Sequence, residues 1–235
     1  MNRMAGFHHL AVSTGNIKAQ IEFCTDVLGM QLVALHWMHG VPDTWHGFLR
    51  LNDESSIAFV QNPTIAGLGC EIGRTHAGNP GGTSAPGTMQ HVALRVDRAE
   101  ELLVMRDRLR SKGVPVLGPI DHGMCQSIYF AGPEHLALEI SWSATPIDPD
   151  AWIDPEVAAR AGIEPEELER YRNPPDPGQP EFPVPQPGAD APGPHMAGYP
   201  PGVYEGLLTI PDDRISDGIE HRSPAEIRAA GQDGP

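Results

Sequence analysis

The sequence predicts an α+β fold made of two paired βαβββ modules that form a curved, partly closed sheet, followed by a proline-rich C-terminal extension. Three observations lead to this prediction: a short motif occurs twice, the same order of helix and strand signals follows each copy, and the composition changes near residue 145. We expect a domain over residues 1–145 and an acidic extension with short helices over residues 146–235. The expected modules cover about residues 7–62 and 89–142, and residues 63–88 connect them.

The repeated motif is a short apolar strand that carries a histidine. FHHLAV at residues 7–12 aligns with MQHVAL at residues 89–94. After the first copy, Asn16 can cap a helix over residues 17–27, and Gly29 then ends it. The motif and its helix therefore predict the first two elements of a βαβββ module.

The same signals follow the second copy of the motif. Asp97 precedes an expected helix over residues 99–112, and Gly113 ends it. Three strand-like runs follow each helix. The expected strands cover residues 31–37, 45–51 and 56–61 in the first half, and residues 114–117, 127–131 and 136–142 in the second.

Pairing of the two modules follows from the size of each sheet. A βαβββ module cannot cover both faces of its own small sheet, so we expect two copies to pack around a shared concave surface. The equivalent histidines of the two first strands, His9 and His91, should then lie near one another. The glycines and prolines of residues 76–87 predict a flexible connector that is able to reach over such a site.

Charge and proline content separate the domain from the extension. Residues up to Thr145 carry 13 acidic side chains, 10 basic side chains and 7 prolines. The remaining residues carry 18 acidic side chains, 6 basic side chains and 18 prolines. The extension should contain helices over residues 154–161 and 164–171 and be irregular elsewhere. Its length and polarity suggest that it wraps around the domain, that it makes contacts within a homodimer or higher homo-oligomer, or that it is disordered.

The overall composition narrows the classes of partner. A net charge of −15 disfavours binding to nucleic acid and to anionic membranes, so we expect a small-molecule substrate. No apolar run reaches the roughly 20 residues of a membrane span, and the first six residues do not resemble a secretory signal. Three cysteines without metal-site spacing fit reduced thiols, and we expect a cytoplasmic protein.

Three side chains have the chemistry of a mononuclear metal site. His9 and His91 provide imidazoles from equivalent strands, and Glu139 interrupts the apolar run LALEI at residues 136–140. A carboxylate buried in such a strand is costly unless a cation or another partner is present. We therefore expect the curved sheet to surround a divalent metal held by these three residues, whereas His8 points to the opposite face.

Three segments resemble the glyoxalase, bleomycin-resistance and extradiol-dioxygenase superfamily, also called the vicinal oxygen chelate superfamily. They are FHHLAV, MQHVAL and SIYFAGPEHLALEI at residues 127–140. The resemblance covers about residues 7–142 and leaves the extension outside. It implies a metal-dependent enzyme whose reaction has to be chosen from the side chains around the metal.

The ligand pattern favours the dioxygenase branch of this superfamily. In the glyoxalase and epimerase branches, the resemblance implies a fourth ligand, Glu or Gln, on the last strand of the first module. Alignment places Ala58 or Phe59 there, and Gln61 reaches that position only if the register slips. Two histidines and one carboxylate resemble the facial triad of extradiol dioxygenases, which use Fe(II) or sometimes Mn(II).

Further side chains bear on this choice. Tyr129 precedes Glu139 much as a tyrosine does in extradiol enzymes, and His122 lies close to it in the sequence. The acid–base histidine of that family has no counterpart at Ser55 or Ser56, so we consider His46 as its replacement. The nearby histidines His36 and His39 are less specific candidates.

Three functions remain open at this point. The first is an oxygen-dependent ring-cleaving enzyme that acts on a catechol-like or hydroquinone-like substrate, with Fe(II) as the expected metal and Mn(II) as the alternative. The second is a metal-dependent isomerase, epimerase or lyase using Zn(II), Ni(II) or Co(II), with a fourth ligand near Gln61. The third is a non-catalytic, resistance-type protein that binds a small molecule.

Overall fold

The computed structural model describes residues 4–176, 178 and 180–232. Residues 4–168 form one compact unit, and the described residues from 169 onward belong to a second unit. The compact unit therefore extends past the boundary at residue 145 that composition suggested. Trp152 explains part of this difference, because its ring lies so close to Gly123 that a β-carbon there would be 2.9 Å from it.

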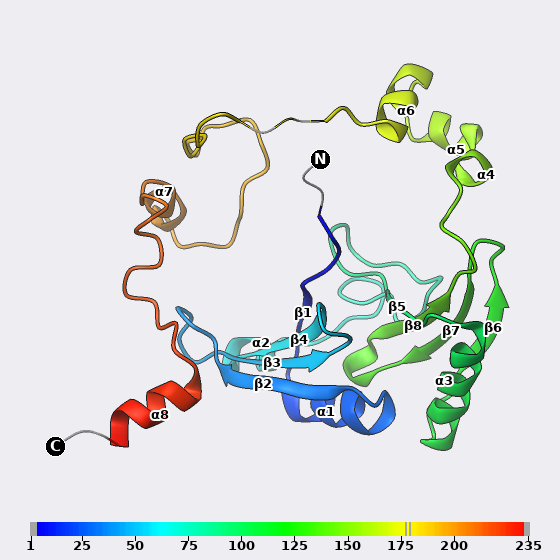
Figure 1. Ribbon diagram of the computed structural model, residues 1–235, viewed down its shortest axis with the longest axis horizontal. Coiled ribbons are helices and arrows are strands. Elements are labelled where there is room, and N and C mark those ends of the chain that lie inside the picture. Colours follow the sequence, from blue (N-terminus) through cyan, green and yellow to red (C-terminus); the bar gives the residue numbers. More distant parts are fainter. Residues whose placement is uncertain (1–3, 177, 179, 233–235) are drawn as a thin grey trace. The chain divides into compact units, whose positions relative to one another are not determined.

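Two four-stranded mixed sheets form the compact unit, and each follows the predicted order of elements (Figure 1). In the first sheet the order is β1-β4-β3-β2, with β1 parallel to β4 and the other pairs antiparallel. The second sheet repeats this topology in the order β5-β8-β7-β6. The strands are β1 His9–Ser13, β2 Gln31–Trp37, β3 Trp45–Arg50, β4 Ser56–Gln61, β5 Val92–Arg95, β6 Leu117–Asp121, β7 Gln126–Ala131 and β8 Ala137–Trp142.

Each sheet has its own helix, as the repeat predicted. Helix α1, Ile17–Glu22, packs against β3 and β4 and continues as a π-helical segment, η1, over Phe23–Val27. The side chain of Asn16 caps α1 by accepting a hydrogen bond from the Ala19 amide at 3.1 Å. Helix α3, Ala99–Ser111, packs against β7 and β8 (Figure 1).

One strand lies later in the chain than expected. Residues 114–117 were predicted as a strand, but β6 begins only at Leu117. The Val114 amide donates to the carbonyl of Leu109 at 3.0 Å, so the chain is still completing the end of α3 at this point. Gly113, with φ +78°, makes this helix end possible.

Short helices occupy more of the chain than the sequence suggested. Outside its two expected helices the extension was predicted to be irregular, and this was wrong for three segments. The missed signal at the last helix is a capping box, since the Ser223 amide donates to Glu226 at 2.6 Å and the Glu226 amide donates to Ser223 at 3.3 Å. The short helices are α2 Pro63–Gly67, η2 Pro133–His135, α4 Pro149–Trp152, α5 Pro155–Arg160, α6 Pro165–Arg172, α7 Val203–Leu208 and α8 Pro224–Gln232. In the described part of the chain, no helix is long and apolar enough to cross a membrane.

Side-chain packing joins the two modules. The buried core contains residues of both, and the rings of Phe23 and Phe130 stack with their centroids 6.4 Å apart. Arg108 of α3 adds polar contacts, donating to the carbonyl oxygens of Val27 at 2.6 Å and Asp26 at 3.1 Å. Among the described residues, β1 and β5 pair only within their own sheets, so these side-chain contacts determine how the modules meet.

Glu134 forms a second polar contact between the modules. From the turn before β8, its carboxylate accepts hydrogen bonds from the Thr14 hydroxyl at 2.5 Å, the Gly15 amide at 2.7 Å and the Gln20 side chain at 2.8 Å. Burial alone raises the pKa of Glu134, but the hydrogen bonds from Thr14, Gln20 and Gly15 outweigh burial and leave this pKa lowered. The carboxylate therefore ties the end of β1 to the second module.

We expect Glu134→Gln to lower the free energy of unfolding by about 1–2 kcal/mol at neutral pH, because an amide group can accept at only one end. Because the pKa of Glu134 in the folded state is below its ordinary value of 4.5, the ionised carboxylate stabilises the fold, and this contribution is fully present at pH values above 4.5. This stability is lost as the pH falls through the lower folded-state pKa. Denaturant unfolding from pH 3 to 7 should therefore show a shallower acid limb in the variant.

Glu54→Gln is the matched control, because Glu54 is exposed and lies in the turn before β4. It should leave both the stability and its pH dependence unchanged. Equal acid limbs for wild type and Glu134→Gln would contradict the role assigned to this carboxylate.

Candidate metal centre

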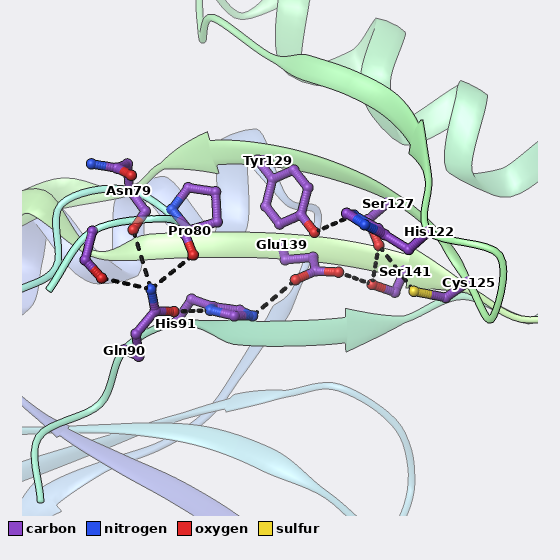
Figure 2. A network of polar contacts seen from close by, with 11 residues as sticks. Asn79, Pro80, Gln90, His91, His122, Cys125, Ser127, Tyr129, Glu139 and Ser141 are labelled. Atoms are coloured by element: carbon purple, nitrogen blue, oxygen red, sulfur yellow. Dashed lines mark hydrogen bonds and ion pairs between the residues drawn. The ribbon is translucent and has the colours of Figure 1, made fainter. Parts of the chain in front are cut away.

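The second sheet brings His91 and Glu139 together. Glu139 lies on β8 between Ala93 of β5 and Tyr129 of β7, and only 5% of its surface is exposed. His91 directly precedes β5, and its Nε2 lies 3.0 Å from Oε2 of Glu139 (Figure 2). Two of the three predicted metal ligands therefore meet on one face of the sheet.

Two serines support the other carboxylate oxygen. The Ser141 hydroxyl donates to Oε1 of Glu139, and it is also 2.8 Å from the hydroxyl of Ser127 (Figure 2). Sequence reasoning missed both serines. The available signal was strand alternation, because Ser141 is two positions from Glu139 on β8 and so shares its face. These hydroxyls fix the orientation of a carboxylate that lies in an apolar strand.

Tyr129 and His122 form a hydrogen-bonded pair beside this carboxylate. The Tyr129 hydroxyl and Nε2 of His122 are 2.8 Å apart, and Tyr129 is directly opposite Glu139 in the β7–β8 register. Burial raises the pKa of Tyr129, and the negative charge of Glu139 adds to this effect. The tyrosine hydroxyl therefore keeps its proton at neutral pH and can donate it to a hydrogen bond.

His9 lies in a different cluster, on the first sheet. Its Nδ1 is 2.8 Å from Nδ1 of His8, and its ring centroid is 5.4 Å from Phe48 and 6.3 Å from His46. In the described ranges, no group of three or more His, Cys, Asp or Glu side chains is placed to hold a metal ion. The predicted triad of His9, His91 and Glu139 thus stays a prediction, of which the structure shows the last two members together.

His46 is nearly enclosed within this first cluster. It lies on β3 opposite His36 of β2, only 8% of the residue is exposed, and its buried Nε2 has no hydrogen-bond partner among the described residues. Burial lowers the pKa of His46, and the His36 and His9 imidazoles lower it further. Its ring lies against Phe48 with a centroid distance of 4.4 Å, and His36 in turn contacts His39 at 5.4 Å.

Gln61 has a structural task that occupies both ends of its amide. Its Oε1 accepts a hydrogen bond from the Ile17 amide at 2.7 Å, and its Nε2 donates to the Gly15 carbonyl at 3.0 Å. The side chain therefore holds the start of α1 against β4. This arrangement does not support the fourth-ligand position that the isomerase or lyase alternative requires.

The polar face of the second sheet, which carries His91, Glu139 and Ser141, has side chains suited to binding a divalent metal. An imidazole nitrogen and a carboxylate oxygen converge there, and such a mixed N and O donor set suits Fe, Mn, Zn, Ni and Co ions. Glu139 is a buried carboxylate whose negative charge a cation would compensate. His9 is the repeat equivalent of His91, but it belongs to the other sheet and would have to approach across the junction between the modules.

Comparison with known proteins agrees with this reading of the fold. Residues 6–140 match the model of the Glyoxalase/Bleomycin resistance protein/Dioxygenase superfamily. A biphenyl-2,3-diol 1,2-dioxygenase of Rhodococcus globerulus is 26% identical over 151 residues, which cover 63% of this chain and 69% of that protein.

Solved structures of the same type are also similar to this chain. A glyoxylase/bleomycin resistance protein/dioxygenase domain from Frankia sp. EAN1pec aligns with a TM-score of 0.48 and 16% identity over 60% of this chain and 99% of that one. The fosfomycin resistance protein FosX from Listeria monocytogenes aligns with a TM-score of 0.41 and 15% identity, over 60% and 96% of the two chains. On the strength of the family match over residues 6–140, the chain belongs to the glyoxalase/bleomycin resistance protein/dioxygenase superfamily.

Proposed function

We propose that the protein is a metal-dependent, ring-cleaving dioxygenase of the extradiol type that acts on a catechol-like or hydroquinone-like small molecule. The observation that carries this proposal is that Glu139 and Tyr129, directly opposite each other on the adjacent strands β8 and β7, each contact a histidine: His91 for Glu139 and His122 for Tyr129. The similarity to a biphenyl-diol dioxygenase supports the same chemistry. A cytoplasmic location and a homodimer or higher homo-oligomer remain predictions from the sequence.

His91 and Glu139 would hold the metal, with His9 as the third protein ligand. When bound, Fe(II), or Mn(II) in its place, supplies Lewis acidity toward the diol oxygens and the redox capacity that reaction with O2 requires. Three protein ligands leave positions open for small molecules. The Ser141 hydroxyl keeps the Glu139 carboxylate oriented for this task.

Tyr129 and His122 would handle hydrogen bonds and protons on the substrate. The Tyr129 hydroxyl is suited to donate a hydrogen bond to a substrate oxygen because burial keeps it protonated. His122, 2.8 Å from that hydroxyl, can accept or return its proton. His46 of the first sheet remains the candidate for the acid–base histidine; its Nε2 is buried and has no hydrogen-bond partner among the described residues, so the first sheet would have to open for a diol hydroxyl to reach it.

A resistance-type protein that binds a small molecule without catalysis is the second candidate. It is favoured by the position of His9, which lies against the Phe48 ring rather than in one group with His91 and Glu139. In that case the histidines and aromatic rings of the first sheet would bind an aromatic ligand directly. Metal content separates the two candidates.

Anaerobically purified wild-type protein should contain close to one iron or manganese ion per chain. We expect His91→Ala and His9→Ala each to reduce this content at least tenfold, because each removes a proposed ligand. The measurement is elemental analysis followed by oxygen uptake with a panel of catechols and hydroquinones. His221→Ala, at an exposed position in the second unit, should retain the metal and is the matched control.

Zinc, nickel or cobalt instead of iron or manganese would favour an isomerase or lyase. Wild-type protein that neither contains a metal nor takes one up on reconstitution would overturn the dioxygenase proposal and favour the binding protein. Loss of metal from His91→Ala but not from His9→Ala would remove His9 from the ligand set.

Tyr129→Phe should lower kcat about 100-fold, because the hydroxyl that acts on the substrate is lost while the metal ligands remain. The metal content should equal that of wild type. His122→Gln should also lower kcat, and the double variant should be less impaired than the product of the single effects, since the two groups share a hydrogen bond.

The matched control is the His195–Tyr204 pair of the second unit, in which Nδ1 and the hydroxyl are 3.4 Å apart. Tyr204→Phe should leave steady-state oxygen uptake unchanged. Strictly multiplicative effects of Tyr129→Phe and His122→Gln would show that the two residues act independently.

A further inference from the structure

Gln90 bridges a metal-ligand candidate and the connector between the modules. Its side-chain nitrogen lies 2.8 Å from the carbonyl oxygen of Pro80, 3.2 Å from that of Gly82 and 3.4 Å from that of Asn79. At its other end, Oε1 contacts Nδ1 of the adjacent His91 (Figure 2). One amide group therefore contacts both the turn at residues 79–82 and the imidazole next to Glu139.

The chemistry of these partners fixes the orientation of the amide. Backbone carbonyl oxygens only accept hydrogen bonds, so the NH2 end of Gln90 has to face the turn and its oxygen has to face His91. An amide oxygen only accepts, and Nδ1 of His91 must therefore carry a hydrogen. This leaves Nε2, which lies beside Glu139, as the nitrogen that can bind a metal.

The turn itself is tightly built. The Gly82 amide donates to the Asn79 carbonyl at 3.0 Å, and the Gly81 amide donates to the Asn79 side chain at 3.0 Å. A β-carbon at Gly82 would lie 2.2 Å from the carbonyl oxygen of the buried Ala77, so only glycine fits there. The turn consequently presents its carbonyl oxygens to Gln90 in a defined arrangement.

We propose that Gln90 is a positioning residue that couples the conformation of the connector turn at residues 79–82 to the orientation of the His91 imidazole. This inference rests on the proposed function, because it takes His91 and Glu139 as the metal ligands. A turn that holds Gln90 in place favours the ring orientation that binds metal. By reciprocity, metal bound at Nε2 stabilises the turn.

Co(II) binding and hydrogen–deuterium exchange test the two halves of this coupling separately. Co(II) absorption in the visible range reports both affinity and the ligand environment. In wild type, Co(II) should slow amide exchange across residues 79–82. Gln90→Met, which is similar in size but has neither polar end, should weaken Co(II) binding about 10–100-fold. It should also speed exchange of the turn and abolish the effect of Co(II) on that exchange.

Gln90→Glu separates ligand orientation from turn stability. A carboxylate can accept from Nδ1 of His91 but cannot donate to the three carbonyl oxygens. Co(II) affinity should therefore recover only in part, to between the values of Gln90→Met and wild type, because the acceptor for Nδ1 is restored but the turn no longer holds it. The turn should still exchange fast with and without Co(II). Gln31→Met, at an exposed position on the edge strand β2, is the matched control and should behave as wild type in both measurements.

Wild-type Co(II) affinity in Gln90→Met would overturn the proposal, and so would an unchanged exchange rate of the turn in that variant. An equal effect of Co(II) on the turn in wild type and Gln90→Met would overturn the coupling. Failure of wild type to bind Co(II) at all would instead refute the proposed function, and this inference with it. The wild-type titration distinguishes that result from a failure of the Gln90 role alone.

Discussion

The buried carboxylate of Glu139 is the constraint on which the polar face of the second sheet depends. An uncompensated buried charge costs roughly several kcal/mol, so the surrounding strands have to supply partners. Ser141 comes from the same strand, Ser127 supports Ser141 from β7, and His91 approaches from the start of β5. The contacts of Ser141, Ser127 and His91 in the second module therefore all serve, directly or through a neighbour, to compensate this carboxylate.

Strand alternation allows that polar face to coexist with a hydrophobic core. On β8, Leu138 and Ile140 belong to the buried cluster shared with α3, whereas Glu139 and Ser141 point to the other side. The same period on β7 separates Ile128 and Phe130 from Ser127 and Tyr129. One sheet can thus pack against its helix and present hydrogen-bonding groups without interrupting the core.

The junction between the modules is the less constrained part of the site. Within each sheet, backbone hydrogen bonds set the register, but the contact between sheets relies on side chains such as Phe23, Phe130 and Arg108 and on the Glu134 carboxylate. Ladder hydrogen bonds fix positions along a strand, whereas packed side chains allow small rotations and shifts. His91 and Glu139 lie together within the second sheet, whereas His9 packs against Phe48 of its own, first sheet.

Local signals were enough to predict the repeated βαβββ order and the family, and to name His91 and Glu139 as parts of one site and Tyr129 and His122 as candidates beside it. These signals are helix caps and glycine stops, the period of two along strands, and a carboxylate within an apolar run. The folded chain was needed to show that Gln61 holds the start of α1 against β4, that Glu134 joins the modules, and that Gln90 contacts His91 and three carbonyl oxygens of the connector. Such contacts depend on backbone atoms brought together by folding, and no spacing in the sequence encodes which carbonyl or amide group a glutamine or glutamate will meet.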